Sequence, residues 1–267
     1  METNRIYHGD CLEIMKNIPD GFIDLTVTSP PYDNLRDYNG YKFDFEGVAK
    51  ELYRVTKEGG VVVWVVADRT VKGNESGTSF RQALHFKEIG FNLHDTMIYE
   101  KNGSAMRGSL KGYNQLFEYM FVFAKGTIGT YNIIRDKSNK TAGHSRLTSN
   151  RGKDGKVNIQ GLCETENYTR RGNIWRYSTG YMQSSKDKIA FEHPAIFPEQ
   201  LAEDHILSWS NPWDIVFDPM CGSGTTLKMA LKNDRRYIGI DISKEYCEIA
   251  EKRIEDWRNE LAKKTYL

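Results

Sequence analysis

The sequence predicts an α/β fold in which helices cover a mostly parallel sheet. Short apolar runs alternate with amphipathic stretches at both ends of the chain, which is the pattern of strands joined by crossover helices. Hydrophobic residues make up 39% of the 267 residues, enough for a sizeable buried core. No apolar run approaches the roughly 18 residues that a membrane-spanning helix needs, so we expect no membrane partner.

The first 125 residues contain most of the predicted elements. In chain order, strands are expected at residues 5–8, 22–28, 61–67, 91–99 and 117–123, and helices at residues 12–17, 45–57 and 79–89. The helix at 45–57 has an apolar stripe at Phe45, Val48, Ala49, Leu52 and Val55. Glycines at positions 59 and 60 are expected to break the chain before the apolar strand at 61–67, and the glycine at position 90 to end the third helix.

The last 70 residues return to the same alternation. A helix is expected at residues 198–209, followed by a strand at 214–217, a helix at 225–231 and a strand at 236–240. Ser243 is a suitable N-cap for a final helix that runs to about Leu261. These elements have the composition of a second βαβ unit.

Between these two regions, residues 126–188 show little sustained periodicity. Glycine, small polar and basic residues dominate, so we expect a loop-rich segment that orders in part on binding a ligand. Residues 125–188 contain 13 Lys/Arg and 5 Asp/Glu, whereas the rest of the chain contains 24 and 31. A basic segment on an acidic body favours a polyanionic partner, and a solvated loop with surface lysines is the alternative.

A glycine-rich turn follows the predicted strand at 214–217. Its sequence, Asp218-Pro-Met-Cys-Gly-Ser-Gly-Thr-Thr226, places two glycines where the backbone turns into a helix. The next strand ends at Asp241, the position from which a carboxylate binds ribose hydroxyls in nucleotide-binding βαβ units. A P-loop would need a Lys-Ser/Thr pair after the last glycine, and Thr-Thr stands there instead. The turn therefore predicts a site for a neutral or cationic nucleoside.

A second motif, Thr28-Ser-Pro-Pro-Tyr32, ends the predicted strand at 22–28. Two prolines fix the backbone and remove two N–H donors, so the carbonyls of this turn are presented rigidly. Open α/β sheets bind their ligands at the carboxyl ends of strands. Taken alone, the motif is more typical of an ordinary proline turn.

Together the motifs resemble those of beta-class amino-group DNA methyltransferases, the cytosine-N4 and adenine-N6 family of the Ser-Pro-Pro-Tyr type. Residues 29–32 resemble the catalytic motif and residues 218–226 the AdoMet loop. His193-Pro-Ala-Ile-Phe-Pro198 resembles the segment that packs on the methionine end of AdoMet, and His8-Gly9-Asp10 the turn that reaches its adenine. Catalytic motif, basic insert and AdoMet loop follow one another in the permuted order of that class.

The resemblance implies a Rossmann-like AdoMet-dependent methyltransferase fold, circularly permuted, with an inserted target-recognition region. Residues 1–125 and 191–267 would form the catalytic and AdoMet-binding halves, and residues 126–190 the insert. The strands at 214–217 and 236–240 would be the first two of the methyltransferase sheet, with 5–8 as the third and 22–28 as the fourth. AdoMet would then lie between the two ends of the chain.

The resemblance also assigns roles to residues. Catalysis would rest on Ser29, Pro30, Pro31 and Tyr32. AdoMet would be bound by Asp10, His193, Phe197, Asp218, Pro219, Cys221, Gly222, Gly224, Thr225, Thr226 and Asp241. DNA would be contacted by Arg36, Tyr38, Arg170, Arg171 and Arg176, with Trp175 and Tyr177 suited to stacking. No metal is expected, because the four cysteines, Cys11, Cys163, Cys221 and Cys247, have irregular spacings.

The expected activity is site-specific transfer of a methyl group from AdoMet to the N4 amino group of a flipped cytosine. Serine at position 29 favours cytosine, because family members with Asp or Asn there mostly act on adenine. Adenine N6, an RNA or protein amino group, and an inactive AdoMet- and nucleic-acid-binding protein are the alternatives. The expected partner is double-stranded DNA with a short recognition sequence, in a prokaryotic or phage-infected cytoplasm. A homodimer and a partner restriction endonuclease remain open.

Overall fold

The computed structural model describes residues 1–31, 43–105 and 113–265. The chain forms two compact units. The main unit comprises residues 1–132 and 173–267, and the inserted unit comprises Ile133–Gly172. Each unit is described by itself below.

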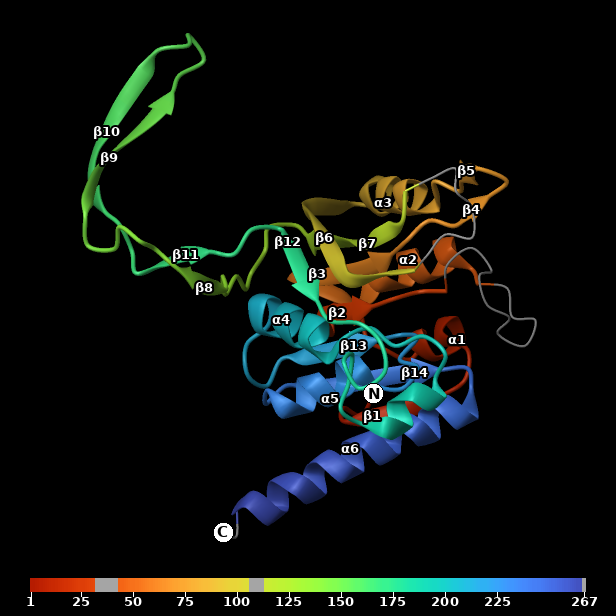
Figure 1. The fold of residues 1–267 in the computed structure, drawn as a ribbon. Coiled ribbons are helices and arrows are strands. Elements are labelled where there is room, and N and C mark those ends of the chain that lie inside the picture. The colour runs from red at the N-terminus through yellow and green to blue at the C-terminus, as the bar shows by residue number, and fades with distance from the viewer. Residues whose placement is uncertain (32–42, 106–112, 266–267) are drawn as a thin grey trace. The chain divides into compact units, whose positions relative to one another are not determined.

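An eight-stranded sheet organises the main unit (Figure 1). Its strands, in spatial order, are β1 (Arg5–His8), β14 (Arg236–Asp241), β13 (Ile215–Asp218), β2 (Ile23–Thr28), β3 (Thr56–Val66), β7 (Gln115–Lys125), β6 (Phe91–Ala105) and β12 (Ile174–Tyr177). The first five strands are parallel, and β7 is antiparallel to both of its neighbours. The predicted fold is confirmed, because β14 and β13, from the end of the chain, lie between β1 and β2, from its beginning.

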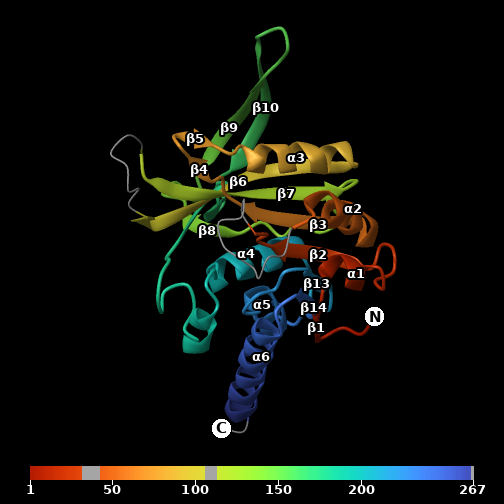
Figure 2. The same ribbon diagram turned by 90° about the vertical axis from the view of Figure 1, so that its right-hand side faces the viewer.

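Helices cover both faces of this sheet (Figure 2). One face carries α1 (Cys11–Met15), α2 (Phe45–Val55) and α3 (Thr78–Glu88), which contact one another in sequence. The other carries α4 (Glu199–Trp209), α5 (Thr225–Lys232) and α6 (Lys244–Thr265), preceded by the 3-10 helix η1 (Lys188–Glu192). A short hairpin, β4 (Thr70–Val71) and β5 (Asn74–Glu75), precedes α3. None of the described helices is both long and apolar enough to span a membrane.

The core under α2 and α3 is aromatic. Phe86 stacks on Phe123 with ring centroids 4.5 Å apart, and it also meets Trp64 edge-on. Trp64 is fully buried, and its indole Nε1 donates a 2.9 Å hydrogen bond to Oε1 of Gln82. Burying a large ring while satisfying its only polar atom is the condition under which tryptophan stabilises a core.

Two sequence predictions at α2 and β3 are corrected. Helix α2 ends at Val55, where Thr56 Oγ1 donates a 2.6 Å hydrogen bond back to the Leu52 carbonyl. Strand β3 already begins at Thr56, and the two glycines that were expected to precede it lie inside it. Ile23 of β2 pairs with Thr56, and Leu25 pairs with Val61, so β3 has extra residues between these two pairs. The two glycines lie in this stretch and mark a bulge in β3.

Strand β12 was also missed, since its residues were assigned to a loop-rich segment. Trp175 and Tyr177 are each only 6% exposed and pack toward α4, where the Tyr177 hydroxyl donates to Asp204 Oδ2 at 2.8 Å. The Trp175 ring lies 4.7 Å from that of His205, whose complete burial lowers its pKa to about 3. These two aromatic rings are therefore core side chains and are not available to stack on DNA bases. The signal in the sequence was weak: Trp175 and Tyr177 flank the polar Arg176, whereas Ile174 is apolar although it is exposed.

The inserted unit contains four strands where little regular structure was predicted. Strand β8 (Arg135–Ser138) pairs antiparallel with β11 (Tyr168–Arg170), and β9 (Ser145–Arg151) with β10 (Val157–Glu164). Both ladders are largely exposed; Leu147, Val157, Ile159 and Leu162 are between 58% and 75% exposed. Because these strands are held by backbone hydrogen bonds with little burial, their sequence lacks the period-two pattern of a half-buried sheet.

Candidate functional site

The carboxyl ends of the four strands β1, β14, β13 and β2 meet at one edge of the sheet. In register, His8 pairs with Asp241, and Asp218 pairs with Gly239 on the same strand, β14. The predicted site residues near the two ends of the sequence are thereby brought to one place. Open α/β sheets bind ligands at this edge, where neighbouring loops diverge.

Two side-chain hydrogen bonds join the turn after β2 to the turn after β13. Thr28 Oγ1 donates to Asp218 Oδ1 at 2.7 Å, and Thr226 Oγ1 donates to the carbonyl of Val27 at 3.0 Å. Thr28 and Thr226 are fully buried. Ser29 follows Thr28 directly, so the Ser-Pro-Pro turn begins beside the glycine turn although 190 positions separate Thr28 from Asp218.

Thr28 is a site residue that the sequence analysis missed. It was included in the motif only as its first letter, with no role of its own. The available signal was a polar residue at the end of an apolar strand, because a buried hydroxyl needs a partner. Of the four predicted catalytic residues, Ser29 and Pro31 are partly buried and Pro30 is buried. Tyr32, together with the predicted DNA-contacting Arg36 and Tyr38, lies outside the described residues.

The glycine turn requires its glycines on steric grounds. Gly222 has φ +48° and Gly224 has φ +76°, both in the left-handed region, and Gly224 is the N-cap of α5. A Cβ on Gly224 would lie 2.7 Å from Cβ of Ala250, and one on Gly222 would lie 2.8 Å from Nε2 of His193. The turn is therefore pressed between α6 on one side and His193 on the other.

Asp241 shapes the glycine turn from the neighbouring strand. Its Oδ2 accepts a 2.8 Å hydrogen bond from the Gly222 N–H, and its Oδ1 accepts one of 2.9 Å from Ser243 N–H. The backbone carbonyl of the same residue accepts from Gly9 N–H at 2.9 Å. Each carboxylate oxygen has a second lone pair, so the side chain retains capacity for a ligand hydroxyl.

Two further predicted side chains, those of His193 and Asp10, make defined contacts near this turn. The His193 ring meets Tyr246 edge-on, with centroids 4.3 Å apart, and its Nδ1 accepts from Ala195 N–H at 3.1 Å. Asp10 caps α1 by accepting from Leu12 N–H at 2.8 Å. His193 faces Gly222, and Asp10 follows Gly9, whose N–H donates to the Asp241 carbonyl, so segments from three parts of the chain meet at the glycine turn.

The site contains two buried carboxyl groups with raised pKa values. Burial raises the pKa of Asp218 to about 7, and the nearby charge of Asp241 adds to this rise, while the Thr28 hydroxyl opposes it. Burial likewise raises the pKa of Asp241. A cation bound beside these carboxyl groups would lower their pKa values and favour the carboxylate forms.

The cysteines around the site are neutral thiols. Burial raises the pKa of Cys11 and of Cys247 to about 12, and raises that of Cys221 well above its usual range. The Cys221 sulfur lies 3.1 Å from where a Cβ on Gly239 would stand, so it fills space between the two strands. A thiol held in this state is a packing group and a poor nucleophile.

The predicted DNA-contacting arginines fall in both units. Arg170 is exposed on β11, and the adjacent Arg171 binds Asp136, with 2.6 Å between Arg171 Nε and Asp136 Oδ2. Arg176 belongs to the main unit, on β12, and donates to Glu100 Oε1 at 2.5 Å. Its side chain is 68% exposed, so this ion pair leaves most of the guanidinium in solvent.

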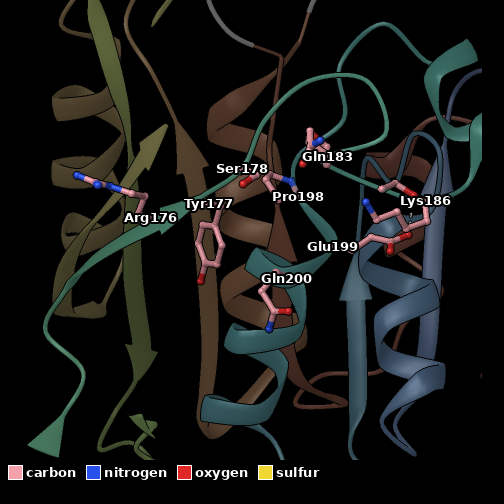
Figure 3. A pocket seen from close by; sticks show the side chains of 10 residues that line it. Arg176, Tyr177, Ser178, Gln183, Lys186, Pro198, Glu199 and Gln200 are labelled. Atoms are coloured by element: carbon pink, nitrogen blue, oxygen red, sulfur yellow. Dashed lines mark hydrogen bonds between the residues drawn. The ribbon is translucent and has the colours of Figure 1, made fainter. Parts of the chain in front are cut away.

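A pocket that the sequence did not indicate lies where β12 ends and α4 begins (Figure 3). It has a volume of about 360 Å³, and Tyr177, Gln183, Lys186, Glu199 and Gln200 contribute to its lining. Among the described residues, no group of three or more His, Cys, Asp or Glu side chains is arranged to hold a metal ion.

Comparison with known proteins agrees with this arrangement. The family model N6_N4_Mtase, described as DNA methylase, matches residues 23–252. Orphan methyltransferase M.BamHII of Bacillus amyloliquefaciens is 59% identical over 249 residues, covering 91% of this chain and 92% of that protein. DNA adenine methyltransferase YhdJ of Escherichia coli (strain K12) is 27% identical, covering 95% and 83%. Among solved structures, PvuII DNA methyltransferase (cytosine-N4-specific) matches with a TM-score of 0.68 at 22% identity, covering 95% of this chain and 86% of that one.

Proposed function

We propose, from the premise that this chain belongs to the DNA methylase family, that it methylates the N4 amino group of a flipped cytosine at a specific short sequence in double-stranded DNA. One observation supports this proposal above the others. The Thr28–Asp218 hydrogen bond, 2.7 Å long, holds the Ser-Pro-Pro turn beside the glycine turn. A methyl donor at one turn and an acceptor amine at the other would then be neighbours, and orientation of this kind supplies a large part of a rate enhancement.

AdoMet is the proposed cofactor at the glycine turn. The donor set fits it, since Asp241 retains acceptor capacity for ribose hydroxyls and the buried Asp218 and Asp241 carboxyls favour a cation. His193 and Phe197 would pack on the methionine end and Asp10 would reach the adenine, while Pro219, Cys221, Gly222, Gly224, Thr225 and Thr226 form the turn itself. AdoMet supplies a methyl group on a positively charged sulfur, which is a good leaving group.

The chain's own task is to activate a weak nucleophile. The lone pair of the cytosine amino nitrogen is delocalised into the ring, and a base stacked in a duplex must first be flipped out. The Ser29 hydroxyl and the Pro30 carbonyl would accept hydrogen bonds from the two amino hydrogens and favour a tetrahedral nitrogen. Pro31 holds the carbonyl in place, and Tyr32 would stack on the flipped ring. Fixed dipoles aimed at the developing charge are an effective way to lower such a barrier.

The choice of cytosine over adenine rests on Ser29. Its motif, Ser-Pro-Pro-Tyr, is commonest among the cytosine-N4 members of the class that the chain resembles. Adenine N6 is the second candidate, and a relative named as a DNA adenine methyltransferase, at 27% identity, supports it. The same two acceptors can hold either amino group, so the geometry of the turn is compatible with both bases.

Nucleoside analysis tests the proposal directly. Duplex DNA is incubated with the protein and AdoMet, digested, and examined by mass spectrometry for methylated nucleosides, with RNA and protein as competing substrates. We expect N4-methylcytosine in the DNA. N6-methyladenine would overturn the base assignment alone, and AdoMet binding without any methylated product would favour the inactive binding protein.

The inserted unit is the proposed target-recognition region, with Arg170 and Arg171 on phosphates and Arg176 contacting DNA from the main unit. Such contacts would be sensitive to salt, because each neutralised phosphate releases counterions. A prokaryotic or phage-infected cytoplasm, where DNA is accessible, is the proposed location. A homodimer and a partner endonuclease would be tested by light scattering and by co-purification.

A further inference from the structure

A buried ionic cluster lies behind the glycine turn, on the side of α6. Arg253 of α6, whose side chain is 0% exposed, donates to Asp187 Oδ2 at 2.9 Å and to Glu199 Oε1 at 2.7 Å. Lys228 of α5 donates to the same two oxygens, at 2.7 Å and 3.0 Å. The two cations are buried and the two carboxylates are partly exposed, and their opposite charges balance, which is the condition for keeping Arg253 and Lys228 charged in the interior.

Arg253 differs from Lys228 in what its remaining nitrogen does. Arg253 Nη1 donates to the Ser223 carbonyl at 2.6 Å, to Ser223 Oγ at 3.1 Å and to Thr225 Oγ1 at 3.2 Å. Ser223 stands between the two left-handed glycines of the turn. The planar guanidinium can bind carboxylates with one edge and a backbone carbonyl with another, which a single ammonium cannot do in the same geometry.

A steric contact from the same helix acts on the same turn. Cβ of Ala250, three residues before Arg253 on α6, lies 2.7 Å from where a Cβ on Gly224 would stand. Helix α6 therefore meets the turn at two consecutive residues, by close packing at Gly224 and by hydrogen bonds at Ser223. The backbone of the turn is therefore held by α6 as well as by Asp241.

The same ionic cluster also contacts the chain on either side of His193, which faces the glycine turn. Asp187 is the N-cap of η1, which ends at Glu192 and leads into His193. Nε2 of His193 lies 2.8 Å from the position of a Cβ on Gly222. Glu199 begins α4, directly after the His193–Pro198 segment. Arg253 is thus bound to Asp187, which precedes η1, to Glu199, which directly follows the His193–Pro198 segment, and to the turn that this segment faces.

We propose that Arg253 is a positioning residue for AdoMet, holding the glycine turn and the His193 segment at the separation that the cofactor needs. The inference rests on the proposed placement of AdoMet at the glycine turn. Arg253 itself is fully buried and acts through Ser223 and Asp187, so its contribution is to cofactor affinity. The rate of methyl transfer at saturating AdoMet should depend on it much less.

Charge-conserving and matched variants separate positioning from stability. Arg253→Lys keeps the charge balance with Asp187 and Glu199 but has one nitrogen in place of three. Lys228→Met removes a cation from the same two carboxylates without altering the contacts to Ser223 and Thr225. We expect Arg253→Lys to weaken AdoMet binding in calorimetry by about tenfold or more. We expect Lys228→Met to lower the melting temperature while AdoMet affinity stays within about twofold of the parent, a difference near the scatter of such measurements.

Single-turnover methylation at saturating AdoMet completes the test. Arg253→Lys should retain most of the parental rate there, giving a change in KM for AdoMet with kcat nearly unchanged. Parental AdoMet affinity in Arg253→Lys, or an equal loss of affinity in Lys228→Met, would overturn the inference. A parental protein that does not bind AdoMet, or an Asp241→Ala variant that binds it normally, would instead overturn the proposed function on which the inference stands.

Discussion

The glycine turn and the inserted unit form their structures in opposite ways. From Asp218 to Thr226 nearly every residue is buried, and the turn is fixed by α6, by His193 and by Asp241. Strands β9 and β10 are exposed along almost their whole length and depend on backbone pairing. The first region is tightly packed, so adding a methyl group at Gly222 or Gly224 would disrupt it. The second is held by backbone hydrogen bonds, so we expect its exposed side chains to tolerate substitution.

The charges of the two regions are also arranged differently. At the turn, carboxylates accept hydrogen bonds from backbone N–H groups, and their acidity is altered by burial. In the inserted unit, Arg171 binds Asp136 and Arg135 binds Glu166 at partly exposed positions. Exposed ion pairs of this kind contribute little to stability and can be exchanged for phosphates. The comparison predicts large, specific effects of substitutions at the buried edge and small, salt-dependent effects in the insert.

The largest expected effect is the loss of methylation rate in Ser29→Ala. Ser29→Ala removes one proposed acceptor for the target amino group and leaves the Thr28–Asp218 bond in place. Losing one preorganised hydrogen-bonding partner of a transition state costs on the order of 100-fold in rate. Single-turnover kinetics should show this loss while calorimetry shows nearly parental AdoMet affinity. A parental rate would mean that Ser29 is only a turn residue, and the cytosine assignment would lose its main support.

The next effect is expected at Asp241. Asp241→Ala removes the acceptor of the Gly222 N–H and the proposed acceptor of the ribose hydroxyls. At about 1.5–3 kcal/mol for a hydrogen bond to a charged group, AdoMet affinity should fall at least about tenfold in calorimetry. Asp214→Ala is the matched control, because Asp214 accepts from Asn211 N–H at the opposite end of β13. Equal affinities for the Asp241 variant and the parent would place the nucleoside elsewhere.

A smaller effect, on DNA affinity and its salt dependence, is expected when Arg170 and Arg171 are replaced. Replacing both with Ala should weaken DNA binding several-fold and reduce the salt slope by up to about 0.9 for each phosphate that is no longer neutralised. Asp136→Ala is a second, opposite test. It removes the ion-pair partner of Arg171 and should strengthen DNA binding slightly. Binding titrations at several salt concentrations measure both changes. If affinity and slope match the parent throughout, neither arginine binds a phosphate.

A pH dependence of folding stability is expected at Asp218. Its folded-state pKa is raised to about 7 from an ordinary 3.8, so the unfolded chain loses this proton first as pH rises. The group therefore lowers stability progressively between about pH 4 and about pH 7, and that loss is complete above the folded pKa. Asp218→Asn cannot ionise, and its stability relative to the parent should increase across this window. Denaturant titrations at several pH values measure the difference, and parallel curves for the two proteins would refute it.

Much of the fold was predictable because burial leaves a periodic signal. The central strands are continuous apolar runs, and the resemblance predicted that strands from the two ends of the chain share one sheet, as β1, β14, β13 and β2 do. The strands of the inserted unit left no such signal, because they are exposed. Strand β12 was missed because its two buried aromatic residues stand next to a basic, loop-like sequence, where composition outweighed a four-residue alternation.

The site was predictable where a residue type is required by local geometry. A turn that needs left-handed residues shows as glycines in the sequence, and a carboxylate at a strand end shows as an Asp. Gly222, Gly224 and Asp241 could therefore be named. Arg253 and Lys228 could not, because a charged residue on an amphipathic helix is normally on the surface. Only the folded chain brings Asp187 and Glu199 to them. Thr28 belongs to the same class, since its partner lies far away in sequence.

The order of strands in the sheet has a consequence for the synthesis of the protein. Strands β1 and β2 leave the ribosome first, yet β14 and β13 must lie between them, so the sheet stays open until Asp241 has been translated. Pairings between distant parts of a chain form slowly, and unpaired strand edges meanwhile attract other chains. A nascent fragment that ends before β14 lacks the wall that Asp241 provides. The edge of the sheet that carries the candidate site is therefore assembled only after β14 has been translated.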